Sequence, residues 1–188
     1  MNHRDSADTP APWRVAGYRI QLARAVDLPR LAAVERAAAR QFPTRLIPPA
    51  QREGVVPLAV LRQAHAEGRL WVALSPAGPP VGFAVAGSCD GEAFLIELDV
   101  HPAHQCLGLG RALVARVAQW ARAAGYAALA LTTFASLPWN APFYARLGFQ
   151  ALAPEAGGPE LAARLAAEAR LGLRERVAMR LPLAQPQD

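Results

Sequence analysis

Apolar residues recur along the chain at two periods, and each change of period marks an expected element. Strands are expected at 17–23, 69–75, 80–90, 93–100, 127–133, 148–152 and 174–183, and helices at 28–42, 57–67, 109–124, 140–147 and 159–171. Strand–helix–strand units in the middle favour parallel pairing, whereas the early consecutive strands favour antiparallel pairing. The pattern therefore predicts a mixed α/β (α+β) domain built on one sheet.

The segment 93–100 carries the clearest strand pattern. Strict alternation would place four apolar residues on one face and two carboxylates on the other. The apolar set is Phe94, Ile96, Leu98 and Val100, and the carboxylates are Glu97 and Asp99. The following helix shows helical spacing at Leu109, Leu113, Val117 and Trp120, and Gly125 ends it.

Length and composition set the outer limits. The 188 residues suit a single domain, expected at 16–184, with a disordered lead at 1–15 and a frayed tail at 185–188. No apolar run approaches the roughly 18 residues of a membrane helix, and the charged N-terminus does not resemble a signal peptide. We therefore expect a cytoplasmic protein with no membrane partner, either a monomer or a homodimer.

Charge and cysteine content narrow the function classes. The net charge is +5, but all 20 basic residues are arginines scattered along the chain, so no nucleic-acid partner is expected. The two cysteines, Cys89 and Cys106, show no metal-ligand spacing, and no metal is expected. We interpret Cys89 as a strand residue and Cys106 as a loop residue.

The segment Gln105-Cys-Leu-Gly-Leu-Gly-Arg111 leads from a strand into a helix. A helix N-terminus carries unpaired N–H groups and partial positive charge, and glycines let an anion approach them closely. A phosphate site and a tight packing turn both fit this pattern. A Walker A loop is excluded because the chain has no lysine. The sequence does not fit a dinucleotide-binding fingerprint, because Leu113 occupies the position of the third glycine. The next strand also ends in Thr132 and Thr133, with no acidic residue to bind a ribose.

Two motifs in the expected order resemble the GNAT superfamily of N-acetyltransferases. Val100-His-Pro102 followed by Gln105-Cys-Leu-Gly108-Leu-Gly110 is similar to its acetyl-CoA signature. Asn140-Ala-Pro-Phe-Tyr144-Ala-Arg-Leu-Gly-Phe149 is similar to its late motif, with one helix and one strand between. The resemblance covers residues 17–152 in element order. It implies the GNAT fold, a twisted mixed sheet of about seven strands whose central pair splays apart to hold CoA.

The resemblance also implies a site. The backbone of Cys106, Leu107, Gly108, Leu109, Gly110 and Arg111, with Gln105, would hold the pyrophosphate of acetyl-CoA, the co-substrate. Leu98, Asp99 and Val100 would pair with the pantetheine arm, and Asn140 and Phe143 would adjoin it. Tyr144 matches the general acid for the departing thiolate, since a phenol remains protonated at neutral pH. Its alternative role is a core aromatic residue, and Asn140 could instead be a helix cap, because the family's asparagine lies further before the tyrosine.

The sequence identifies neither the acceptor nor the general base. The implied function is direct acetyl transfer to a primary amine of a small molecule or peptide, and the alternative is a non-catalytic acyl-CoA-binding regulatory module. Glu97 and Asp99 could take the ammonium proton or attract the cation, or be exposed carboxylates on a strand face. The family's usual base positions fall near Phe94 and Ile96, which are apolar here. His101 is a weaker candidate, and His104 is expected in a surface loop.

The acceptor is expected to be chosen by residues 27–68 and 133–139. Phe42, Arg45 and Trp71 are candidate pocket residues there, although each also suits the core or the surface. The helix at 159–171 is an addition to the minimal fold that could cover the substrate end or a dimer seam.

Overall fold

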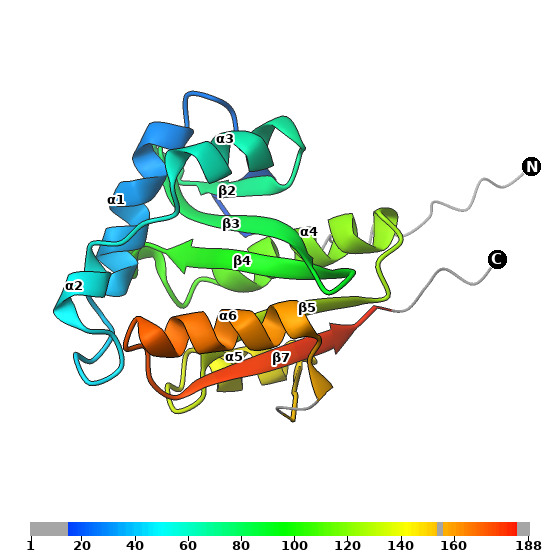
Figure 1. Ribbon diagram of the computed structural model, residues 1–188. Helices are drawn as coiled ribbons and strands as arrows, with labels where there is room; N and C mark the ends of the chain where they lie inside the picture. The colour runs from blue at the N-terminus through cyan, green and yellow to red at the C-terminus, as the bar shows by residue number, and fades with distance from the viewer. Residues whose placement is uncertain (1–14, 154–155, 184–188) are drawn as a thin grey trace, which may run out of the picture.

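The computed structural model describes residues 15–153 and 156–183, which form a seven-stranded sheet in the order β1-β2-β3-β4-β5-β7-β6, flanked by helices (Figure 1). The strands are β1 (Arg19–Leu22), β2 (Leu70–Leu74), β3 (Pro80–Cys89), β4 (Glu92–Val100), β5 (Ala128–Phe134), β6 (Gln150–Ala151) and β7 (Arg176–Pro182). The helices are α1 (Leu28–Ala39), α2 (Pro49–Arg52), α3 (Leu58–Ala66), the 3₁₀ turn η1 (Pro102–His104), α4 (Leu109–Ala123), α5 (Ala141–Arg146) and α6 (Pro159–Arg170). The predicted mixed sheet is confirmed: β4 and β5 are parallel and the other paired strands antiparallel.

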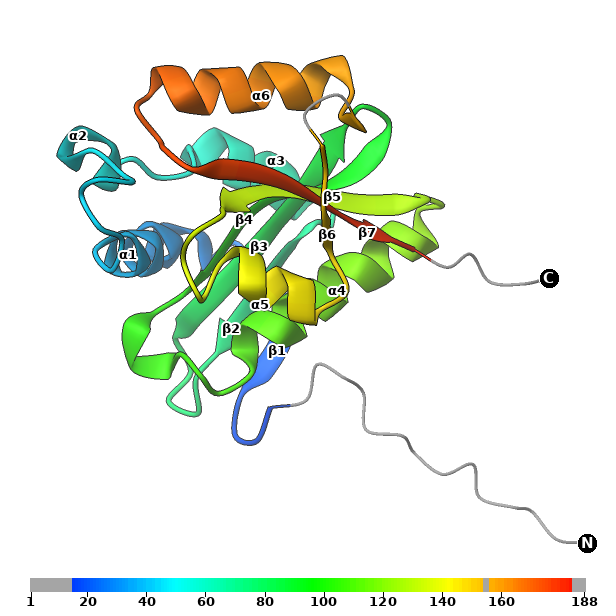
Figure 2. The same ribbon diagram turned by 90° about the horizontal axis from the view of Figure 1, so that it is seen from below.

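Helices cover both faces of the sheet (Figure 2). The buried face of α4, including Leu109, Leu113 and Val117, packs with Leu95 and Leu129 from the sheet, and α5 adds to the same cluster. On the other face, α1 and α3 pack over β2 and β3, and α6 packs over β4, β5 and β7. Fully burying one such leucine contributes roughly 2 kcal/mol, so the three-layer arrangement fixes the position of α4 against the end of β4.

The central strands separate toward the end of β4. β4 and β5 pair only at Ala93↔Leu129 and Phe94↔Ala130, whereas β4 stays paired with β3 as far as Val100. The β4 edge at 98–100 therefore faces an opening rather than β5. This arrangement agrees with the expected splayed pair.

The alternation expected for 93–100 is wrong in one respect. Glu97 lies opposite Val85 but Leu95 lies opposite Ala86, so Ile96 is an extra residue in a β-bulge. As a result, Phe94 and Ile96 pack on the α1–α6 face, whereas Leu98 and Val100 pack toward α4. The bulge moves the side chains after it to the opposite faces.

Most differences from the other expectations concern boundaries. The first helix ends at Ala39 rather than at residue 42, and only Gln150–Ala151 of the expected 148–152 strand is paired. The segment 43–56, between the first two expected helices, contains α2, which was not expected. The expected lead and tail lie outside the described residues, except that Val15 bridges Tyr18. Within the described ranges, no helix is both long and apolar enough to cross a membrane.

Candidate active site

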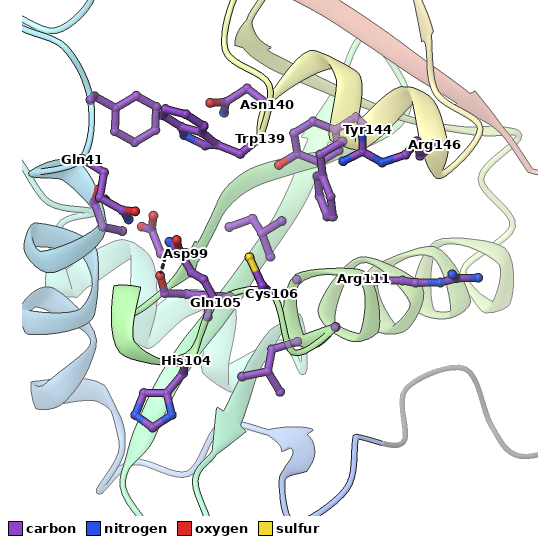
Figure 3. Close-up of a pocket in the computed structure, with 18 residues that line it drawn as sticks. Gln41, Asp99, His104, Gln105, Cys106, Arg111, Trp139, Asn140, Tyr144 and Arg146 are labelled. Carbon is purple, nitrogen blue, oxygen red and sulfur yellow. Dashed lines mark hydrogen bonds between the residues drawn. The ribbon is translucent and has the colours of Figure 1, made fainter.

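A cavity of about 310 Å³ opens where β4 leaves β5. It is lined by the end of β4, the loop before α4, the first turn of α4, the start of α5 and the end of α1 (Figure 3). The expected site residues on its wall are Leu98, Asp99, Val100, Gln105, Cys106, Gly108, Leu109, Gly110, Arg111, Asn140, Phe143 and Tyr144. Leu107 is half-exposed, and neither it nor Glu97 is among the residues that line the cavity.

The loop before α4 has the backbone shape of an anion site. Gly108 is the N-cap of α4 with φ +85°, a left-handed conformation that favours glycine, and Cys106 also has positive φ at +60°. A Cβ on Gly110 would lie 3.4 Å from the Phe143 ring. The Gln105 amide donates to the Val100 carbonyl at 3.0 Å and ties the loop to the end of β4. The N–H groups of the first turn of α4, which have no partner within a helix, therefore sit beside the cavity.

Tyr144 places a phenol inside the cavity. Its ring is buried on α5 and packs edge-on against Phe143 and Phe149. Figure 3 shows its hydroxyl pointing into the space between Trp139 and Asp99. Burial, and then the negative charge of Glu97 and Asp99, raise the pKa of Tyr144 far above its usual value. The hydroxyl therefore keeps its proton and can act as a hydrogen-bond donor.

Asn140 is the N-cap residue of α5, as one interpretation of the sequence expected, and its carbonyl accepts from Tyr144 N at 3.1 Å, but its side chain makes no capping hydrogen bond. Its Nδ2 donates instead to the Thr133 hydroxyl at 3.0 Å, which links α5 to β5. Its Oδ1 is buried and, among the described residues, has no hydrogen-bond partner. A carbonyl left in this state can accept a hydrogen bond from a ligand in the cavity.

Three carboxylates converge behind the opening. Oxygens of Glu35, Glu97 and Asp99 lie within 4.8 Å of one another, and all three side chains are partly or fully buried. The alternative that Glu97 and Asp99 are exposed is therefore wrong. Both oxygens of Glu35 accept from the Val56 N–H at 3.0 Å, and Glu97 accepts from Leu98 N at 3.2 Å. Asp99 Oδ2 is buried with no partner within 15–153 and 156–183.

Burial and mutual repulsion make these carboxyls more basic than usual. Burial and the Glu97 charge raise the pKa of Glu35 to about 7. Burial raises the pKa of Glu97, and burial together with the charges of Glu97 and Glu35 raises the pKa of Asp99 well above its usual range. Three close carboxylates repel one another, so the cluster has a high affinity for a proton or another cation.

Sequence reasoning missed Glu35 and Trp139. Glu35 lies among Leu31, Val34 and Ala38 on the buried side of α1, and a charged residue on an apolar helix face was the available signal. Trp139 is half-exposed at the cavity wall, and no periodic pattern marks its loop.

The remaining sequence candidates fall in different places. Phe42 lines the cavity, whereas Arg45 pairs with Glu175 on the surface and Trp71 is buried against Trp120. His104 contacts the Tyr18 hydroxyl at 2.8 Å and lines the cavity, so it is more than a surface-loop residue. His101 accepts from Ala103 N at 3.3 Å. Cys106 is exposed in the loop, and Cys89 is buried at the end of β3.

Comparison of the chain with known protein families identifies the family to which it belongs. Residues 31–149, more than half of the chain, match the model of the acetyltransferase (GNAT) family. This chain belongs to that family.

Solved structures with the same fold share low sequence identity with the chain. N-acetylglutamate synthase from Neisseria gonorrhoeae, complexed with coenzyme A and N-acetyl-glutamate, superposes with a TM-score of 0.67 at 20% identity over 92% of this chain. The chain spans only 36% of that protein's length. The ribosomal-protein-S18-alanine N-acetyltransferase from Escherichia coli gives 0.63 at 22% identity, covering 91% of this chain and 97% of its own. A putative acetyltransferase from Salmonella typhimurium with its cofactor acetyl-CoA gives 0.65 at 21%, covering 92% and 97%.

Proposed function

We propose that the protein transfers the acetyl group of acetyl-CoA directly to a primary amine. The strongest support is that three features lie together in one cavity. These are the unpaired β4 edge, the N-terminus of α4 and the hydroxyl of Tyr144. An extended thioester with a diphosphate at one end fits that combination.

The cofactor would be held mostly by main-chain groups. The N–H groups of residues 106–111 would bind the diphosphate, where the helix dipole favours negative charge. The pantetheine arm would add to the free edge of β4 at Leu98–Val100, in the manner of an extra strand. The buried Oδ1 of Asn140 would accept from one of its amides.

Tyr144 would act on the leaving group. The neutral amine nitrogen attacks the thioester carbonyl and a C–N bond forms. The C–S bond then breaks, and the sulfur takes up, by way of the Tyr144 hydroxyl, the proton that the nitrogen loses as the amide forms, so that CoA leaves as the thiol. A hydrogen bond from the Tyr144 hydroxyl stabilises the charge that develops on sulfur. The raised pKa of Tyr144 keeps this donor protonated throughout the physiological range.

The carboxylate cluster would act on the nucleophile. An amine enters as an ammonium ion and must lose a proton before it can attack. Asp99 lines the cavity and Glu97 lies next to it, so Asp99 would accept the proton first, with Glu97 able to share it. Their raised pKa values make them better proton acceptors than exposed carboxylates.

Replacing Tyr144 with phenylalanine tests this function. We expect Tyr144→Phe to lower turnover about 100-fold, because one charge-stabilising donor is lost, while acetyl-CoA affinity changes by less than about twofold. Thiol release from acetyl-CoA across a panel of amines gives the rate, and calorimetry gives the affinity. Tyr126→Phe, in the ring cluster with Trp120 outside the cavity, is the matched control.

Unchanged turnover in Tyr144→Phe would remove Tyr144 from the mechanism. Tight acetyl-CoA binding by the wild type without thiol release for any amine would favour the non-catalytic acyl-CoA-binding module instead.

A further inference from the structure

The two ends of the cavity differ in charge. Arg111 and Arg146 come from α4 and α5, at the end where the diphosphate would lie (Figure 3). At the other end, Asp99 is backed by Glu97 and Glu35. Gln41 and Trp139 lie on the same side of the cavity as Asp99 (Figure 3) and carry no charge. Ala38 and Phe42, which also line the cavity, are apolar.

Two arginines whose charges act on the carboxylate cluster, Arg36 on Glu35 and Arg176 on Glu97, have partners elsewhere. Arg176 pairs with Glu168 at 2.8 Å and lies over the Phe134 ring, and Arg36 pairs with Glu53. Negative charge at the acceptor end is therefore only partly balanced by the protein. A carboxylate carried by the acceptor would meet repulsion there, and such like-charge contacts in a site strongly disfavour a ligand.

Asp99 also provides an unused acceptor. The residue lines the cavity, and its Oδ2 is buried and has no hydrogen-bond partner in the described part of the chain. An ammonium ion offers three donors and no acceptor, so it satisfies this oxygen without creating a new unpaired group. A divalent metal fits less well, because both oxygens of Glu35 already accept from Val56 N.

Aromatic rings complete the same end of the cavity. Phe42, held at 5.3 Å from Phe134 between ring centroids, and the half-exposed Trp139 both line it. Apolar and aromatic walls beside a carboxylate suit a cation carried on an apolar body.

On the basis of the proposed function, we infer that the acceptor is a small primary amine on an apolar body, with no carboxylate next to its nitrogen. Asp99 receives the ammonium, Glu97 and Glu35 support the negative charge behind it, and Phe42 and Trp139 contact the body. Amino acids such as glutamate, the acceptor type implied by one neighbour's bound product, are excluded by charge.

Matched pairs of acceptors test this inference, because each pair differs only in the carboxylate. We expect kcat/KM for phenethylamine to exceed that for phenylalanine by about 100-fold or more. We likewise expect kcat/KM for 1,5-diaminopentane to exceed that for lysine. Calorimetric binding of each compound to the CoA-bound protein should show the same preference. In Asp99→Asn, the phenethylamine-to-phenylalanine ratio should shrink at least tenfold, while Glu92→Gln on the same strand should keep it.

The possible outcomes distinguish a failure of the inferred acceptor class from a failure of the proposed acetyl transfer. Phenylalanine or an alanine-initiated peptide used as well as phenethylamine would overturn the inference while leaving acetyl transfer in place. Selective binding of phenethylamine without any thiol release would support the acceptor class and contradict the proposed transfer. Thermal stabilisation by Mn²⁺ that disappears in Asp99→Asn, with no amine preference, would overturn the inference in favour of a metal site.

Discussion

Glu35 shows how one buried side chain links stability to the site. Because the folded-state pKa is raised from 4.5 to about 7, the folded chain binds this proton more tightly than the unfolded chain. Its contribution to stability is therefore complete below pH 4.5 and is lost as the pH rises to about 7. By linkage, the loss amounts to up to about 3 kcal/mol.

Glu35→Gln should remove that loss. Glutamine cannot ionise, and its carbonyl can still accept from Val56 N. We expect the free energy of unfolding of the variant, relative to wild type, to increase by up to about 3 kcal/mol between pH 5 and pH 8. Urea unfolding at several pH values measures this difference. A constant difference over that interval would show that Glu35 ionises normally in the folded protein.

Single residues were predictable where chemistry and motif coincided. Tyr144 and the glycines of the loop could be placed because their types and spacing resemble a known pattern, and Asp99 because it lies on the strand that leads to that loop. Glu35 could not be placed beside Asp99, because the contact joins α1 to β4 across 64 positions of sequence (99 minus 35) and depends on how the helix packs. Trp139 was missed because loop residues follow no periodicity.

At the scale of elements, the proposed function depends most on the loop before α4. Gly108 adopts φ +85°, so any L-residue there pays a strain of about 1–2 kcal/mol. Gly108→Glu adds bulk and negative charge where the diphosphate would bind, whereas Gly108→Ala adds mainly strain. We expect Gly108→Glu to lower acetyl-CoA affinity at least 100-fold and Gly108→Ala much less, measured by calorimetry. Equal affinities in Gly108→Glu and wild type would reject the loop as the anion site.

A contact between two distant elements joins the β3–β4 hairpin to α6. Asp90, at φ +50° in the two-residue turn with Gly91, accepts from Glu160 N at 3.0 Å and from Leu161 N at 2.9 Å. It therefore caps α6 from a distant part of the chain. Asp90→Ala should cost about 1–2 kcal/mol of unfolding free energy and speed amide exchange in the first turn of α6.

Asp90→Asn is the control for that prediction, because asparagine tolerates positive φ and keeps one acceptor oxygen. It should lose less stability than Asp90→Ala. Equal protection of the first turn of α6 in wild type and Asp90→Ala would show that the cap contributes nothing. The Asp-Gly dipeptide is a hairpin signal visible in the sequence, whereas its contact with α6 is not.

The bulge at Ile96 could not be predicted from the hydrophobic pattern of its own strand. Phe94, Ile96, Leu98 and Val100 are apolar at every second position, so the sequence predicts that they share one face. The extra residue becomes apparent only when β4 is paired with β3, since register is a property of two strands. It matters for the site because it directs both Glu97 and Asp99 toward the face of the sheet on which Glu35 of α1 lies.

For the whole molecule, the element order and the mixed sheet followed from periodicity, and the opening between β4 and β5 followed from resemblance. The cavity itself could not be predicted in detail, since α1, β4, α4 and α5 each supply part of its wall. What the fold achieves is a polarised cavity, with helix-terminal N–H groups at one end and carboxylates at the other. Under the proposed function, that polarity favours an anionic cofactor at one end and a cationic acceptor at the other.

The crystal structure of the complex with acetyl-CoA tests this account most directly. We predict the diphosphate on the N–H groups of residues 106–111, the pantetheine arm paired with Leu98–Val100, and the thioester sulfur within hydrogen-bonding distance of the Tyr144 hydroxyl. A cofactor bound away from the β4–β5 opening, or a Tyr144 hydroxyl turned from the sulfur, would contradict it.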